Sequence, residues 1–244
     1  MFEQTNNRGF FPSQEGTQDL TVARSFMTQV FSWMTLAMLV TAVSAYWFSG
    51  AEIHATLTNP DTHKLTGLGW FVAIAPFGFV LLMSFGFQRL SATVLSMLFI
   101  CFSVLMGMSL SSILIVYTGA SVFKTFAVTA AMFGVMAVTG YTTKTDLTKF
   151  GSIMIMGMVG LMIAMLVNFF MQSGVMDYII SVLGVLIFTG LTAYDVQRLK
   201  RIGAGAGEYG QENTRKLSIL GALTLYLDFI NLFLFLLRFL GDRK

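Results

Sequence analysis

Seven long apolar runs dominate the sequence, and the charged residues are confined to the short segments between them. Each run is close to the ~20 residues that an α-helix needs to cross a hydrocarbon core about 30 Å thick. Lipid offers no hydrogen-bond partners, so each run must satisfy its own backbone groups, and the alternation typical of barrel strands is absent. The sequence therefore predicts an all-α, polytopic membrane protein, a seven-transmembrane-helix bundle. The runs cover about 25–48, 70–87, 92–117, 122–143, 150–172, 178–199 and 217–239.

The composition places the chain in a lipid environment. Of its 244 residues, 55% are hydrophobic and only 11% are charged, whereas soluble domains carry about 25% charged residues. The lipid bilayer is thus the one partner that composition implies. The net charge of +3 is small, and we expect it to reflect membrane orientation and not nucleic-acid binding.

The chain divides into a short tail and one membrane domain. Residues 1–23 are polar and are predicted to form a flexible N-terminal tail, without the basic-then-apolar start of a cleaved signal peptide. Residues 24–244 are predicted to form a single transmembrane domain. Two connections are longer than the others, at 49–69 and 200–216, and the Gly-Ala-Gly-Ala-Gly run at 203–207 is interpreted as a flexible linker and not as a phosphate loop.

Lysine and arginine favour a cytoplasmic N-terminus, because basic residues collect on the cytoplasmic side of membrane proteins. Seven full crossings would then put the basic segment 238–244 outside, against that rule, so the sequence leaves open whether the last span crosses fully. The inner side would hold ten basic residues, Arg8, Arg24, Arg89, Lys144, Lys149, Arg198, Lys200, Arg201, Arg215 and Lys216, and the outer side five, Lys64, Lys124, Arg238, Arg243 and Lys244.

Two aspartates interrupt the last two apolar runs. Asp195 lies toward the inner end of the sixth run, and Asp228 lies near the middle of the seventh. An aspartate at the centre of a membrane helix costs roughly 2.5–3.5 kcal/mol, which marks it as a functional candidate. A single inner loop joins these helices, which makes them antiparallel neighbours, so we expect the two carboxyl groups to face each other and titrate as a unit. When ionised, the pair offers oxygen ligands to a cation such as Ca²⁺.

Three further residues are candidates for supporting the pair. Asn231 follows Asp228 by three residues and shares its helix face. Arg198 follows Asp195 by three residues, and a simpler interpretation pairs the two at the inner interface while Asp228 hydrogen-bonds a neighbouring helix. Arg89, in the turn after the second run, is either an ordinary cytoplasmic arginine or a partner for an aspartate.

Glycines within the runs suggest close helix packing. Small residues let the backbones of membrane helices approach each other. The candidates for such contacts are Gly134, Gly157, Gly160, Gly184 and Gly190.

The last two runs also resemble a known family. The segments Phe188-Thr-Gly-Leu-Thr-Ala-Tyr-Asp195-Val-Gln-Arg-Leu-Lys and Ala222-Leu-Thr-Leu-Tyr-Leu-Asp228-Phe-Ile-Asn-Leu-Phe-Leu-Phe-Leu-Leu-Arg238 closely resemble the Bax inhibitor one family, the transmembrane Bax inhibitor motif proteins. The first run, from Arg24, also looks like the beginning of that family. The resemblance covers nearly the whole chain, and the short loops are similar to a bacterial member.

The resemblance implies a fold and a function. Family members are described as seven-helix bundles with a central C-terminal helix, and as pH-sensitive Ca²⁺ leak channels gated by two aspartates that Asp195 and Asp228 match. A second-helix arginine is described as a latch on the first of them; here the second run has no arginine, and Arg89 is the nearest candidate. Bacterial relatives have also been linked, as binding partners, to a membrane-bound AAA protease.

Three functions follow as hypotheses. The first is a pH-sensitive calcium or other cation leak channel of the bacterial cytoplasmic (inner) membrane, requiring no cofactor and performing no enzymatic reaction. The second is a non-conducting regulator that binds a membrane AAA protease. The third, an intramembrane aspartyl protease, is disfavoured because Leu225-Tyr-Leu-Asp228 lacks the Gly-x-Gly-Asp pattern of those enzymes and no proline follows Pro76.

Overall fold

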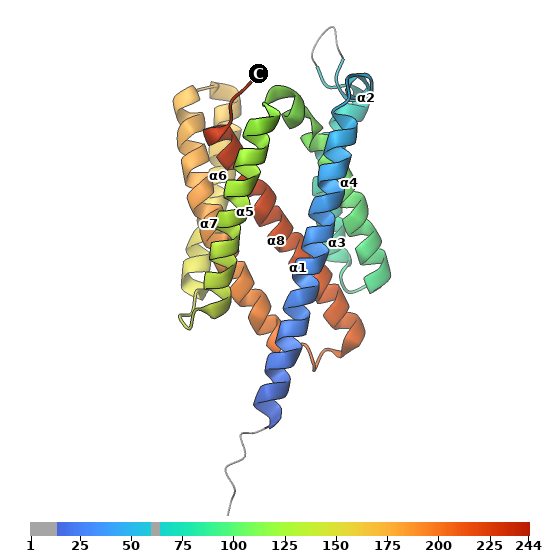
Figure 1. Cartoon of the computed structure of the whole chain (residues 1–244), viewed down its shortest axis with the longest axis vertical. Helices are drawn as coiled ribbons and strands as arrows, with labels where there is room; N and C mark the ends of the chain where they lie inside the picture. Colours follow the sequence, from blue (N-terminus) through green and yellow to red (C-terminus); the bar gives the residue numbers. More distant parts are fainter. Residues whose placement is uncertain (1–13, 60–63) are drawn as a thin grey trace, which may run out of the picture.

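Seven long helices and one short helix make up the structure, a computed structural model that describes residues 14–59 and 64–244. All but α2 are long and apolar enough to cross a bilayer, the first of them over Thr21–Phe48. The prediction of an all-α bundle with seven candidate transmembrane helices is confirmed (Figure 1). The helices are α1 (Gln14–Phe48), α2 (Ala51–Leu57), α3 (Gly67–Gly86), α4 (Ala92–Val116), α5 (Gly119–Thr142), α6 (Thr148–Met171), α7 (Gly174–Ala204) and α8 (Gly210–Leu240).

Hydroxyl side chains define where several helices begin. A serine or threonine just before a helix accepts a hydrogen bond from a backbone amide of the first turn, which has no partner inside the helix. Thr66 caps α3 in this way, Ser91 caps α4, Thr118 caps α5 and Ser173 caps α7. These caps allow very short connections, and short connections make neighbouring helices antiparallel.

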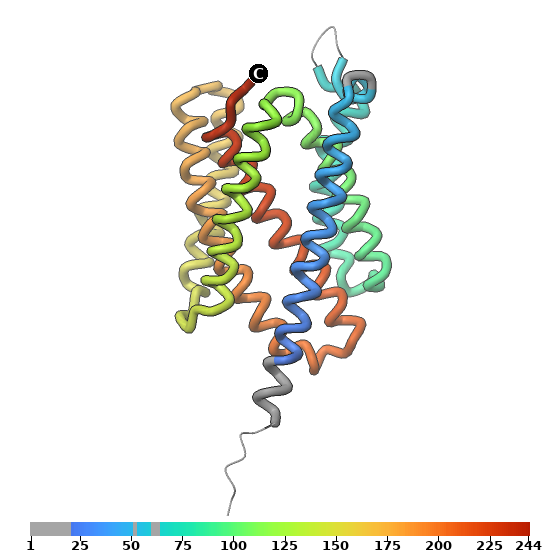
Figure 2. Tube along the Cα trace, viewed as in Figure 1, coloured from blue at the N-terminus to red at the C-terminus, as the bar shows by residue number. Residues whose placement is uncertain are grey.

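Helix α8 occupies the centre of the bundle and contacts α1, α4, α5 and α7 (Figures 1 and 2). In its most apolar stretch 72% of the residues are buried, against 6% in α6. Helix α6 packs against α7, and α3 packs mainly against α4. The central C-terminal helix implied by the family resemblance is therefore confirmed.

The two ends of the described chain lie at opposite ends of the bundle (Figure 2). Helix α8 runs the full length of the bundle and is long and apolar enough to cross a bilayer, and the segment after it lies opposite the start of α1. We call the end that holds the start of α1 the basic end. Its basic residues are Arg24, Arg89, Lys144, Lys149, Arg198, Lys200, Arg201, Arg215 and Lys216.

The C-terminal segment 241–244 is docked onto the turn between α4 and α5. The amide of Thr118 donates to the carbonyl of Asp242 at 3.1 Å. Lys244 Nζ donates to the carbonyl of Leu114 at 2.9 Å, at the end of α4, where the helix dipole favours a cation. The positive charges of this segment thus have local partners, which explains how it is accommodated at the end that the distribution of lysine and arginine disfavours.

The connection predicted at 200–216 is much shorter in the structure, and that prediction was wrong. Helix α7 extends to Ala204 and α8 begins at Gly210. Gly203 lies inside α7, where a Cβ would come within 2.8 Å of the Phe26 ring. The glycine run therefore serves helix packing and a tight turn. The loop length was overestimated because polar residues that follow an apolar run can still be helical.

The other two segments without a predicted helix also contain helical residues. Residues 14–23, assigned to the flexible tail, continue α1, whereas residues 1–13 lie outside the described residues. The connection at 49–69 contains α2 and an isolated bridge between Thr58 and Leu65.

Candidate functional site

Helices α7 and α8 bring Asp195 and Asp228 together in the bundle core. Only 7% of Asp195 and 5% of Asp228 is exposed. The two carboxyl groups are close enough to interact both by charge and by a hydrogen bond. A hydrogen bond between two carboxyl groups requires a proton on one of them, because an ionised carboxylate only accepts.

One oxygen of the pair has no partner. Oδ2 of Asp228 is buried and makes no hydrogen bond with any described residue. Leaving a buried polar atom unsatisfied is costly, more so when the group is charged. This oxygen is therefore a place for a proton or for a cation that enters the site.

Arg198 is the basic residue nearest to the pair. Its Nη1 lies 4.0 Å from Oδ1 of Asp195, and its side chain is 59% exposed while that of Asp195 is 10% exposed. An ion pair that is long and solvated on one side contributes little stability. The pairing of Asp195 with Arg198 in the simpler interpretation is therefore present, with Arg198 extending outward from a buried carboxyl group.

A cavity of about 370 Å³ leads to Asp195. Side chains of α3, α7 and α8 line it, and its polar members besides Asp195 are Arg198, Ser84 of α3 and Thr224 of α8. Asp228 is not part of this lining and lies behind Asp195. A cation entering this cavity would therefore meet Arg198 and Asp195 before it reached Asp228.

Glycines let the helices around the pair approach closely. A Cβ on Gly140 of α5 would overlap the backbone carbonyl of Ala193, two residues before Asp195. A Cβ on Gly221 of α8 would lie 2.7 Å from Cδ2 of Leu199. The first contact holds α5 against α7 beside Asp195, and the second holds α8 against α7 nearer the basic end.

Both aspartates lie in a region of the chain that matches a known protein family. A family model described as inhibitor of apoptosis-promoting Bax1 matches residues 23–244, which include both aspartates. The chain belongs to the Bax inhibitor-1 family. The resemblance noted in the sequence is thereby confirmed.

Bacterial relatives match this Bax inhibitor-1 family chain over most of their length. The inner membrane protein YbhL of Escherichia coli is 47% identical over 221 residues, covering 91% of this chain and 93% of the relative. The protein RP147 of Rickettsia prowazekii is 42% identical over 225 residues, covering 91% of each. A protein of Caulobacter vibrioides is 38% identical over 247 residues, covering 98% of each.

Two of the predicted supporting residues of this Bax inhibitor-1 family member make no hydrogen bond or ion pair with either aspartate among the described residues. Arg89 is exposed in the turn after α3, and the ion pairs found among the described residues do not include it. The latch therefore stays a prediction. Asn231 donates from Nδ2 to the carbonyl of Leu227 in its own helix at 2.8 Å.

A tyrosine that the sequence had not assigned ties α8 to its neighbours. The hydroxyl of Tyr226 lies 2.8 Å from Oγ1 of Thr41 in α1. Its ring packs edge-on against Phe99 and Phe102 of α4. The position of Tyr226, two residues before Asp228, was visible in the sequence, but its partners on α1 and α4 were not.

The glycines predicted to mediate packing divide into two groups. Gly157, Gly184 and Gly190 do lie against neighbouring side chains. Gly134 and Gly160 have open space where a Cβ would be, so for them the prediction was wrong. Both sit on helix faces turned away from the bundle, and nothing in the sequence distinguishes such faces.

The aspartate pair supplies only part of what a bound calcium ion requires. Among the described residues no group of three or more histidine, cysteine, aspartate or glutamate side chains could hold a metal ion. Ca²⁺ takes six to eight oxygen ligands, and the pair supplies two carboxyl groups. Asp195 and Asp228 are therefore better suited to contact a passing cation than to retain one.

Proposed function

We propose that this protein is a pH-sensitive cation leak channel of the bacterial inner membrane, with Ca²⁺ as a permeant ion and the Asp195–Asp228 pair as its gate. One observation carries the proposal: a cavity reaches Asp195, and Asp195 in turn interacts with Asp228 buried behind it. Membership of the Bax inhibitor-1 family supports the activity, and the name of the inner membrane protein YbhL supports the location.

The proton that the pair shares is the proposed switch. While it is held, the hydrogen bond links α7 to α8. Its loss places two negative charges side by side in a medium of low dielectric constant, where their repulsion is many times that in water. Arg198 is the only described cation within 4.0 Å of either carboxyl group, and it offsets one charge at most. The repulsion is relieved when α7 and α8 separate or when a cation binds.

Ion flux into proteoliposomes tests the proposal. Ca²⁺ entry is measured across pH ~5–8 for the unmodified protein, Asp195→Asn and Asp228→Asn. The matched control is Asp146→Asn, which removes an exposed carboxylate at the basic end. We expect a pH-dependent flux whose dependence is lost or strongly shifted in the first two variants and kept in the control.

The opposite result would favour another function. Absence of flux at every pH, in protein shown to be folded, would contradict the channel and favour the non-conducting regulator that binds a membrane AAA protease. The proposal gives the two aspartates no catalytic role, so hydrolysis of a membrane peptide that depended on both would also contradict it.

A further inference from the structure

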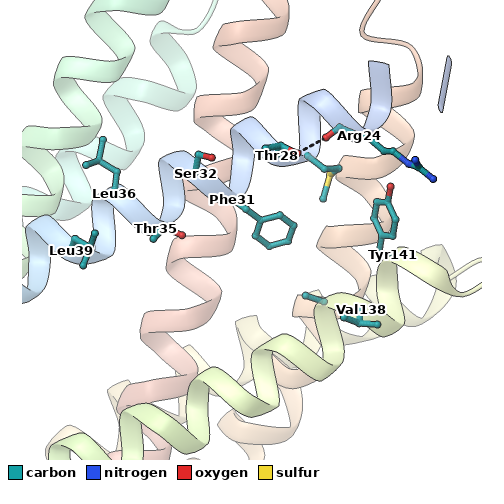
Figure 3. A pocket seen from close by; sticks show the side chains of 11 residues that line it. Arg24, Thr28, Phe31, Ser32, Thr35, Leu36, Leu39, Val138 and Tyr141 are labelled. Atoms are coloured by element: carbon teal, nitrogen blue, oxygen red, sulfur yellow. Dashed lines mark hydrogen bonds between the residues drawn. The ribbon is translucent and has the colours of Figure 1, made fainter. Parts of the chain in front are cut away.

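A groove of about 950 Å³ separates α1 from α5 in the half of the bundle nearest the basic end (Figure 3). Arg24 and Tyr141 lie at one end of it and Leu39 lies at the other, with Phe31 and Val138 between them. Its volume is at the upper limit of typical small-molecule pockets, about 300–1,000 Å³. Its lining residues Leu36, Leu39 and Val138 are exposed, so the groove opens on the outer surface of the bundle, which in a membrane protein faces lipid.

The end of the groove at Arg24 is positively charged. Lys144 and Lys200 line the adjoining cavity, which begins at Ala23 beside Arg24; the carboxylate there, Asp146, is paired with Arg201. Lys200 donates to the carbonyl of Tyr141 at 2.7 Å, which holds its ammonium group near the groove. Among the described residues, no hydrogen bond or ion pair is found for the guanidinium group of Arg24. This cluster therefore has an excess of positive charge beside an apolar channel.

We propose that this groove binds an anionic glycerophospholipid from the leaflet at the basic end. The phosphate lies at Arg24, within the field of Lys144 and Lys200, and one acyl chain follows the groove past Phe31 to Leu39. Basic pockets between transmembrane helices are suited to anionic head groups. The site is separate from the aspartate pair, so the inference does not depend on the proposed channel.

One polar side chain lies at the depth of the lipid ester groups. Thr28 is four residues after Arg24, which places it about 6 Å deeper along the helix. Its hydroxyl already donates to the carbonyl of Arg24 at 2.9 Å, so its oxygen offers only an acceptor and leaves the phosphate to Arg24. Beyond Thr28 the α1 wall is formed by Phe31, Leu36 and Leu39 together with the small hydroxyl side chains of Ser32 and Thr35, and a hydroxyl group in a helix can bond to the backbone carbonyl one turn back.

A lipid fits both parts of the groove better than a helix does. A helix would cover the apolar walls but would leave Arg24 without an anion. A second copy of this chain, packed through the same groove, would bring two basic clusters together, because a two-fold interface uses the same surface on both subunits. An anionic lipid supplies the negative charge and the apolar chain in one molecule.

Native mass spectrometry of the purified protein, released from micelles that contain equal amounts of phosphatidylglycerol and phosphatidylcholine, tests the site. We expect the unmodified protein to retain phosphatidylglycerol preferentially. Arg24→Gln should reduce that preference about fivefold, which corresponds to about 1 kcal/mol for one basic residue. Val138→Trp fills the groove and should reduce retention of both lipids.

Matched variants separate the site from general effects. Arg215→Gln removes an exposed arginine at the same end but outside the groove. Val135→Trp enlarges a side chain of α5 that is 65% exposed, against 63% for Val138, but does not line the groove. Both controls should retain lipid as the unmodified protein does.

Four results would overturn the inference. The first is equal retention of the two lipids by the unmodified protein. The second is an unchanged preference in Arg24→Gln. The third is a dimer that Val138→Trp dissociates, because a second copy would then occupy the groove. Displacement of the lipid by inorganic phosphate alone would count equally against it, since the acyl chain would then contribute nothing.

Discussion

Asp146 is a carboxylate whose setting is opposite to that of the buried pair. It is exposed at the basic end and accepts hydrogen bonds from the amide and the hydroxyl of Thr148 and from Arg201. The bonds from Thr148, and then the bond from Arg201, hold the pKa of Asp146 well below its usual range. Its stabilising contribution is therefore fully present above about pH 4, the value in the unfolded chain, and is lost as the pH falls through the lower value in the folded chain.

Substitution of Asp146 should accordingly leave gating alone. Between pH ~5 and 8 this carboxylate stays ionised, so Asp146→Asn should not move the pH midpoint of Ca²⁺ flux. Its melting temperature should be slightly lower than that of the unmodified protein at neutral pH, and the difference should shrink in strong acid. Flux assays and thermal unfolding check both statements, and a displaced midpoint would show that Asp146 takes part in gating.

Gly140 offers a second test at the scale of one residue. In Gly140→Ala the new Cβ meets the backbone of Ala193, which cannot rotate away. This overpacking should destabilise the protein by about 1–3 kcal/mol. The higher helix propensity of alanine offsets up to about 1 kcal/mol of that loss. Gly134→Ala, with open space at the same helix, is the matched control and should be neutral or stabilising.

Thermal unfolding in detergent measures the difference between these two variants. A net loss of 1 kcal/mol corresponds to about 2–4 °C for a chain of this size. Equal melting temperatures for Gly140→Ala and Gly134→Ala would show that α5 and α7 are not held as closely as the structure has them.

Functional residues were predictable from the sequence where the residue type alone is unusual for its position, and were not predictable where the role depends on a neighbouring helix. Asp195 and Asp228 were found because a carboxyl group in an apolar run is costly wherever the helix lies. Gly140 and the contact of Tyr226 with Thr41 were not found, because they depend on which helix faces which. A glycine facing lipid and a glycine facing a helix look the same in one sequence.

Among the elements, the C-terminal segment and the α4–α5 turn form one unit. Besides the bond from Thr118 to Asp242, the amide of Lys244 donates to the carbonyl of Val116 at 2.9 Å. The amide of Asp242 donates in turn to Oγ of Ser121 at 2.9 Å. The last four residues thus satisfy backbone groups at the end of α4 and are held by the first turn of α5.

Removal of residues 241–244 should expose this turn. The amide of Thr118 loses its acceptor, so we expect it to exchange hydrogen for deuterium much faster. The amide of Val122, which bonds to the carbonyl of Thr118 within the helix, should stay protected and serves as the internal control. Hydrogen exchange followed by mass spectrometry makes the comparison, and unchanged exchange at Thr118 would show that the segment is not docked.

Helix positions were predictable to within a few residues, except where helices leave the bilayer. Hydropathy identifies the stretch that lies in lipid, and α3 to α6 end close to its limits. Helices α7 and α8 continue past it, so the turn between them was overestimated. Their extension depends on contacts such as that of Gly203 with Phe26, which a hydropathy pattern does not contain.

For the whole molecule, the number of crossings can be tested with cysteines. Cys101, the only cysteine, is replaced by serine, and single cysteines are placed at Glu208 in the α7–α8 turn and at Lys244 at the chain end. A membrane-impermeant maleimide added to intact spheroplasts should label Lys244→Cys at once and Glu208→Cys only after permeabilisation. Labelling of both from the same side would contradict an odd number of crossings.

The arrangement of helices was the least predictable feature from hydropathy alone. The mean hydropathy of the most apolar stretch is 2.3 in α6 and 2.0 in α8, yet 6% and 72% of those stretches are buried. Lipid tails are as apolar as a protein interior, so hydropathy does not separate the helix that faces lipid from the helix at the centre. The central place of α8 was expected only from the family resemblance.

The central place of α8 also has a consequence for how the protein is made. The ribosome synthesises α8 last, so the six helices that precede it in the bilayer must wait around a position that is still empty. Until α8 enters, Asp195 has no Asp228 beside it, and the inner faces of α1, α4, α5 and α7 meet lipid. Completion of the chain is thus the step that closes the bundle. A polypeptide truncated before α8 would have helices that insert into the membrane but lack the central helix around which they pack.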